Sequence, residues 1–222
     1  MNVAAFALAA FLAGSSTEEI DLTATSVNVA EPGTPVKIKI LRWSTDEERA
    51  PILVALNPVP PRSPARNSDA APTGRGRAGR GRGRGAAAAP LSPIAAFSAA
   101  LGRAQTIGYI WTNDITGYAI KYAWHASLPD GTERVVLASD RRLGAYTDAW
   151  KPSTPAADTD YSFTLLELRT GPKGLIEGKT SLNSKIVVDE AAKSVVLDNY
   201  AAAGKTLTGA TAVTGLRPPL HP

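Results

Sequence analysis

The chain has 222 residues, 44% of them hydrophobic, which is enough for one substantial core or at most two small ones. Its formal net charge of +4 comes from one segment, because removing the five arginines of residues 74–85 from the 24 basic residues leaves 19 against 20 acidic ones. The chain has no cysteine, which excludes disulfides, thiolate zinc sites and cysteine nucleophiles.

Residues 1–16 predict a signal peptide. The run NVAAFALAAFLAGSS is apolar over the length of a signal-peptide core, and small residues and then the polar stretch STEEID follow it. The run is too short to span a bilayer. We therefore expect a periplasmic or secreted protein, with a buried N-terminal helix as the alternative for this segment.

The first two strands are predicted in residues 19–29 and 36–43. In EIDLTATSVNV and VKIKILRW, apolar residues alternate with polar ones, which is typical of half-buried strands. Between them, Pro32 and Gly33 form the pair that a type II turn favours, because proline presets φ and glycine tolerates a positive φ. A first antiparallel pair is expected here.

Two helices follow the second strand. The first is expected to begin at Ser44, with Glu47 three residues on to complete a capping box. The second is expected to begin at Ser92, with proline in its first turn, and to stop at Gly102. The segment 58–90 between the two helices is rich in proline, alanine, glycine and arginine, which predicts a flexible loop.

The remainder of the chain reads mainly as strands separated by turn formers. The strand-like segments are TIGYIW, GYAIKYAW, ERVVLAS, YSFTLLELR, KIVV, SVVLDNY and TLTGATAV. Sequential strands joined by short turns usually pair antiparallel. The expected fold class is therefore α+β: a β-meander forming a sandwich or an incomplete barrel, with the helix pair inserted after the second strand. We expect a single domain over residues 17–215 and a disordered tail at 216–222.

Several strings along the chain carry a resemblance to a known group of proteins. These strings are RWSTDEER, IGYIW, AIKYAWH, LPDGTERVVLASDRR, DYSFTLLELR, GLIEGKTS and VVLDNYA. Together they are similar to a family of exported bacterial proteins to which no activity is assigned. The resemblance covers most of the chain from Glu19 to about Val213. It implies export from a bacterial cell, and it implies no catalytic residue or cofactor.

The tract GRGRAGRGRGRG at residues 74–85 admits two interpretations. Arginine–glycine repeats bind single-stranded nucleic acid through charge and stacking, so a polyanion such as nucleic acid or polysaccharide is one expected partner. The tract contains no aromatic residue and lies between two helices of one domain, which favours a low-complexity spacer. The candidate polyanion-binding residues are Arg75, Arg77, Arg80, Arg82 and Arg84.

Residue types that usually carry catalysis are few. GPKGLIEGKTS lacks the spacing of a phosphate-binding loop, since Lys173 stands where the first glycine is required, and a glycine-bounded hairpin is the better interpretation. His125 is the one catalytic candidate, with an ordinary exposed histidine as the alternative. On the expected strand GYAIKYAW, the alternation places Tyr118, Ile120, Tyr122 and Trp124 on one face and His125 on the other. No metal site and no cofactor is expected.

The stretch SDRRLG supplies the remaining cluster. Asp140, Arg141 and Arg142 follow a predicted strand, and an arginine fork suits carboxylate or phosphate. A buried Asp–Arg pair that ties a loop to the sheet is the alternative.

The leading hypothesis is an exported, non-enzymatic protein that binds a ligand or a protein partner through the sheet face or the loops near Arg141 and Trp150. The alternatives are polyanion binding through the arginine–glycine tract and hydrolysis of an envelope polymer by carboxylates and His125.

Overall fold

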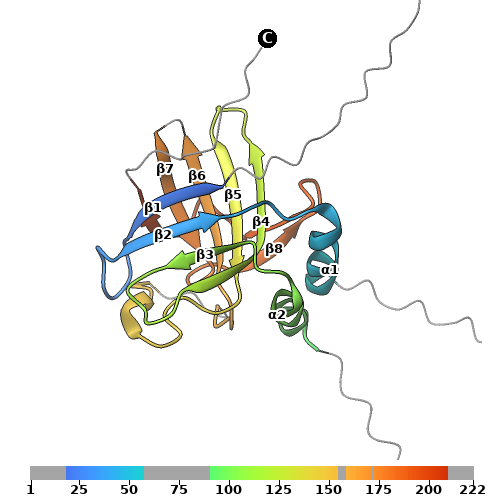
Figure 1. Ribbon diagram of the computed structural model, residues 1–222, viewed down its shortest axis with the longest axis horizontal. Helices are drawn as coiled ribbons and strands as arrows, with labels where there is room; N and C mark the ends of the chain where they lie inside the picture. The colour runs from blue at the N-terminus through green and yellow to red at the C-terminus, as the bar shows by residue number, and fades with distance from the viewer. Residues whose placement is uncertain (1–18, 58–90, 155–158, 172, 210–222) are drawn as a thin grey trace, which may run out of the picture.

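The computed structural model describes residues 19–57, 91–154, 159–171 and 173–209, and Figure 1 shows them as a barrel flanked by two helices and a hairpin. The α+β class and the insertion of the helix pair after the second strand are confirmed. The sheet is a fully closed barrel, because β1 pairs with both β2 and β10. The predicted signal peptide at 1–16, the arginine–glycine tract and the tail at 216–222 lie outside the described residues.

The barrel contains eight antiparallel strands in the order β1-β2-β3-β4-β5-β6-β7-β10. Their bounds are β1 Ile20–Ser26, β2 Pro35–Ile40, β3 Gly108–Trp111, β4 Tyr118–Ser127, β5 Glu133–Ser139, β6 Leu165–Gly171, β7 Gly174–Thr180 and β10 Lys205–Thr208. The glycine-bounded hairpin expected in GPKGLIEGKTS is present, since Gly171 pairs with Gly174 at the β6–β7 turn, and its second arm is the barrel strand β7. Gly178 fits there because a side chain would collide with Leu168 and Leu207.

The barrel interior is filled with apolar side chains. In β1 the alternation expected from the sequence holds, with Ile20, Leu22 and Ala24 buried and the residues between them exposed. The β5–β6 connection contains the short 3₁₀ helix η1 (Asp148–Trp150), whose Ala149 is also buried in the barrel core. Trp150 is buried in the same core cluster. This segment is held by backbone hydrogen bonds from Ala30 and Glu31 of the β1–β2 turn.

The helices are α1 (Asp46–Leu56) and α2 (Pro93–Arg103). Ser92 caps α2 as expected, but the capping box of α1 is Thr45 with Glu48, one residue later than predicted. The physical reason is that Ser44 is hydrogen-bonded to β4: its backbone N–H donates to Ala123 O and its side chain accepts from Ala123 N. None of the described helices is long and apolar enough to cross a membrane.

A second core lies outside the barrel. The outer faces of β4, β5 and β6 are covered there by α1, α2 and the hairpin of β8 (Ile186–Asp189) and β9 (Ser194–Leu197). An irregularity in the pairing of β4 between Ile120 and Tyr122 makes this possible. The prediction that Tyr118, Ile120, Tyr122 and Trp124 share one face of β4 is therefore wrong. Tyr118 and Ile120 lie in the barrel core, whereas Tyr122 and Trp124 pack in the second core on the outer face.

Candidate functional site

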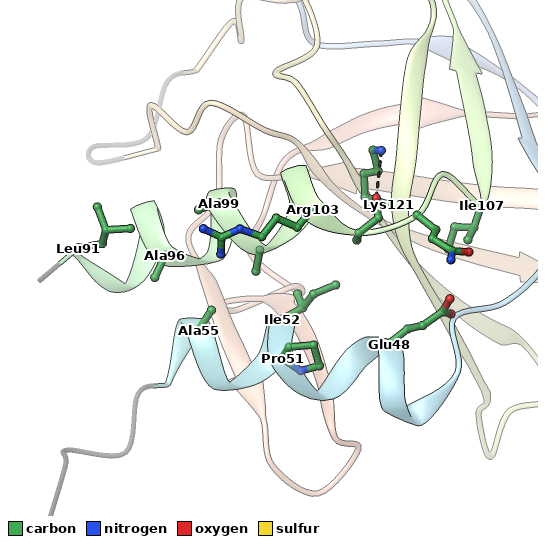
Figure 2. A pocket seen from close by; sticks show the side chains of 13 residues that line it. Glu48, Pro51, Ile52, Ala55, Leu91, Ala96, Ala99, Arg103, Ile107 and Lys121 are labelled. Carbon is green, nitrogen blue, oxygen red and sulfur yellow. Dashed lines mark hydrogen bonds between the residues drawn. The ribbon is translucent and has the colours of Figure 1, made fainter.

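A pocket of about 440 Å³ lies between α1, α2 and the barrel, and we call it the helix–barrel pocket (Figure 2). Its volume is within the range of small-molecule sites, which is roughly 300–1,000 Å³. Figure 2 shows α1 and α2 side by side, with Pro51, Ile52 and Ala55 directed from α1 toward α2.

The apolar wall of the pocket follows from alanine spacing on α2. Ala96, Ala99 and Ala100 are three and four residues apart, so they share one face of the helix. Because their side chains are small, they leave space opposite Ile52 of α1, whereas larger residues at these positions would fill it. Ile107 adds an apolar contact from the segment that enters β3.

Glu48 lines the pocket, but its charge is already compensated. Arg42 donates to both of its carboxylate oxygens at 2.7 Å, and the backbone N–H of Thr45 donates to the same carboxylate at 3.0 Å. The hydrogen bonds from Arg42 lower the pKa of Glu48 below its ordinary value, against an opposing effect of burial. Arg42 also donates to Gln105 at 3.1 Å, which orders another lining residue.

Two cations at the pocket lack such compensation. Lys121 is half-buried, and its ammonium donates to Ala104 O at 3.1 Å and to Thr106 Oγ1 at 3.0 Å. Arg103 is exposed in the last turn of α2. Neither side chain forms an ion pair with a carboxylate of the described residues. The uncompensated charge of the helix–barrel pocket is therefore positive, and it adjoins an apolar wall.

Asp140 and Arg141 lie at the end of β5 and hold loops together. The guanidinium of Arg141 donates to Thr116 Oγ1 at 3.1 Å and to the carbonyl of Gly117, and it lies 5.1 Å from the Tyr118 ring centroid. Asp140 accepts from Ala119 N at 3.1 Å, across the β4–β5 boundary. The Asp140–Arg141 pair itself is 3.7 Å apart and about 30% exposed, so it is not the buried pair considered as the alternative, although its contacts tie the β3–β4 loop to the sheet.

Arg142 and Trp150 are brought together at a smaller, polar pocket of about 260 Å³. Arg142 donates to Asp160 at 2.8 Å, and the Asp160 side chain is fully exposed. Trp150 is 1% exposed, so the indole offers almost no surface to a ligand. Asp140 and Arg141 do not line this pocket.

His125 lies near the end of β4 with 42% of its side chain exposed. Its ring stacks on Trp43 with centroids 4.2 Å apart, and its Nδ1 is 3.5 Å from Glu133 Oε2. Ser127 donates to Glu133 rather than to His125. The arrangement therefore lacks the direct contact between nucleophile and base that activates a serine.

Among the residues that the structure describes, no group of three or more histidine, aspartate or glutamate side chains is placed to hold a metal ion.

The helix–barrel pocket was missed by sequence reasoning. The signal was present in IAAFSAALGR, where small residues recur at helical spacing, but the same pattern is compatible with close helix packing.

No protein-family model matches this chain, and neither the curated proteins nor the solved structures include a significant match to it.

Proposed function

We propose that this chain is an exported binding protein that holds a small amphipathic anion, with an apolar body and one acidic head, in the helix–barrel pocket. The observation that carries the proposal is the juxtaposition of an apolar wall with two cations, Arg103 and Lys121, that no described carboxylate neutralises. An acidic head supplies the missing counter-charge, and an apolar body replaces water along the alanine face of α2.

The two cations suit an acid in different ways. Arg103 offers a planar fork that matches a carboxylate, and its position at the end of α2 leaves it accessible to a ligand. Lys121 is already held by Ala104 O and Thr106 Oγ1, so its ammonium is ordered before a ligand arrives. An ordered donor costs less conformational entropy on binding than a mobile one.

Isothermal titration of the chain with octanoate, octanol and octylamine tests the chemistry of the ligand. We expect octanoate to bind most tightly and octylamine least, because only the head group changes along this series. Replacing Arg103 by alanine should weaken octanoate binding and leave octanol binding unchanged. Tighter binding of octylamine than of octanoate would contradict the proposal.

A pair of leucine variants on α2 tests the location of the site. Ala99→Leu places a larger side chain on the pocket wall, whereas Ala95→Leu adds the same bulk at an exposed position outside the lining. We expect Ala99→Leu to abolish octanoate binding and Ala95→Leu to leave it intact. Equal binding by both variants would place the ligand elsewhere.

Native mass spectrometry of protein purified without denaturant should in addition reveal a retained small acid.

Export is a separate part of the proposal and has its own test. The full-length gene is expressed in a bacterial host, and the mass of the product is measured in the periplasmic and cytoplasmic fractions. A periplasmic chain that begins near residue 17 is expected. A chain found only in the cytoplasm and beginning at Met1 would contradict export.

A further inference from the structure

The outer face of β3 presents two large aromatic side chains to solvent. Tyr109 is 40% and Trp111 is 41% exposed, and their ring centroids are 5.5 Å apart. Both project outward because residues two apart on a strand share a face, whereas Ile110 between them points into the barrel core. Burying aromatic rings is favourable, so an exposed pair on one strand indicates a binding surface.

The position of Trp111 depends on a glycine in the connection to β4. A β-carbon at Gly117 would lie 3.1 Å from both Cδ1 and Nε1 of the Trp111 indole. The indole therefore rests against the bare backbone of Gly117, which supports it from one side while much of the ring remains open to solvent. A supported ring loses little freedom when a ligand stacks on it.

Polar side chains flank each aromatic ring in register. Tyr109 lies beside Lys39 of β2, which lies beside Asp21 of β1. Trp111 lies beside Lys37, which lies beside Thr23. Each ring is thus accompanied by a long hydrogen-bond donor and then by a short oxygen-bearing side chain. We call these six residues the aromatic face.

The charge of this surface decides which ligand class it suits. Lys39 pairs with Glu19 at 2.6 Å and lies in register beside Asp21, so Lys37 and Lys39 are matched in number by the carboxylates of Asp21 and Glu19. A surface that binds nucleic acid or another polyanion needs an excess of positive charge. The helices and the β8–β9 hairpin cover β4 to β6 instead, so none of these described elements covers the aromatic face (Figure 1).

We propose that the aromatic face binds an uncharged oligosaccharide, with neighbouring pyranose rings stacked on Trp111 and Tyr109. The C–H face of a pyranose ring is apolar and packs on an aromatic ring, whereas its hydroxyl groups both donate and accept hydrogen bonds. The two lysines can donate hydrogen bonds to the sugar hydroxyl groups, and the side-chain oxygens of Asp21 and Thr23 can accept hydrogen bonds from them. This site is distinct from the helix–barrel pocket and does not depend on the function proposed for that pocket.

Affinity electrophoresis of the whole chain tests the proposal with three probes: neutral glucomannan, anionic alginate and single-stranded oligothymidylate. Glucomannan should retard the protein. The apparent affinity derived from this retardation should fall at least about tenfold in Trp111→Ala and by a smaller factor in Tyr109→Ala. Trp111→Phe, which keeps a stacking ring, should restore most of it. Ile176→Ala is the matched control, because Ile176 is an exposed apolar residue on β7, and it should leave binding unchanged.

Three results would overturn the proposal. If only alginate or oligothymidylate retards the protein, and Trp111→Ala abolishes this retardation, the aromatic face binds a polyanion instead. Glucomannan binding that survives Trp111→Ala and Tyr109→Ala would place the glycan elsewhere. Absence of binding to a panel of neutral glucans and mannans would reject the ligand class. Because both aromatic side chains are exposed, the variants should fold, which circular dichroism verifies.

Discussion

Gly144 lies directly against Trp150, a buried side chain of the barrel core cluster. A β-carbon at position 144 would be 2.7 Å from Trp150 Cβ and 2.9 Å from the carbonyl oxygen of Thr147. The backbone of Gly144 also has φ of +75°, a region that other residues enter only with strain. Two independent constraints therefore require glycine at this position.

Gly144→Ala should destabilise the protein by about 2–4 kcal/mol, as the combined cost of a left-handed alanine and an overpacked contact. Gly131→Ala is the matched control, because Gly131 has φ of +78° but no atom within 4 Å of the added carbon. It should cost only about 1 kcal/mol. Urea unfolding of both variants measures the difference, and equal losses would show that contact with Trp150 is not a constraint.

A fully buried carboxylate links the barrel to the β8–β9 hairpin. Glu167 of β6 is fully buried, accepts from Arg134 Nε at 2.7 Å and accepts from the backbone N–H of Leu197 at 3.1 Å. It thus joins the barrel to β9. Glu167→Ala should cost about 3–5 kcal/mol, because it leaves the backbone N–H of Leu197 without its acceptor and leaves the Arg134 guanidinium with Asp189, at 3.6 Å, in place of a buried carboxylate.

The matched control for Glu167 is the ion pair of Arg142 and Asp160. Its N–O distance of 2.8 Å is almost the same, but the Asp160 side chain is fully exposed. Asp160→Asn should therefore leave the free energy of unfolding unchanged within error. A loss for Glu167→Ala as small as that for Asp160→Asn would show that the Glu167 carboxylate does not hold the hairpin to the barrel.

Much of the fold was predictable because its elements obey local rules. Alternation identified β1 and β2, and Ser92 followed by proline located the start of α2. The start of α1 was predicted one residue early because Ser44 and Thr45 are both good caps. Pairing of Ser44 with Ala123, a residue of β4, decides between them, and that contact joins positions far apart in the sequence.

The candidate sites were less predictable for a similar reason. The irregular pairing after Ile120 reverses which residues of β4 face inward, and no local signal in the sequence marks it. Tyr109 and Trp111 alternate with apolar residues as any strand would, so exposure of their rings depends on which barrel face the helices leave open. The helix–barrel pocket likewise requires the packing of α1 against α2 to be known.

The ion pair of Glu48 and Arg42 should make stability depend on pH in acid. The hydrogen bonds from Arg42 lower the pKa of Glu48 in the folded state below its ordinary value of 4.5. The stabilisation is therefore complete above pH 4.5 and is lost as the pH falls through the lower, folded pKa. Unfolding free energies measured from neutral to acidic pH should fall less steeply for Glu48→Gln than for the parent.

Arg42→Gln removes the same pair from the other side. It should flatten the same acidic part of the profile, and the double variant should add little to either single variant, because both remove one interaction. A parent and a Glu48→Gln variant with parallel pH profiles would contradict the coupling.

Tyr118 should limit stability at alkaline pH. Its ring is buried, its hydroxyl donates to Asp114, and the backbone N–H of Gly144 donates to it at 3.0 Å. Burial first, and then the bond to Asp114, raises the pKa of the Tyr118 phenol above its ordinary value of 10.0. Stability is complete below pH 10.0 and decreases as the pH rises toward the folded pKa, because the unfolded chain ionises first.

Spectrophotometric titration of the six tyrosines checks this expectation. Tyr118 should ionise only as the barrel unfolds, so its absorbance change should coincide with the loss of circular dichroism. In Tyr118→Phe one late-titrating phenol should disappear, and stability at neutral pH should fall by about 1–3 kcal/mol because Gly144 loses its acceptor. A folded protein in which every tyrosine ionises with an ordinary midpoint would show that the phenol of Tyr118 reaches solvent without unfolding.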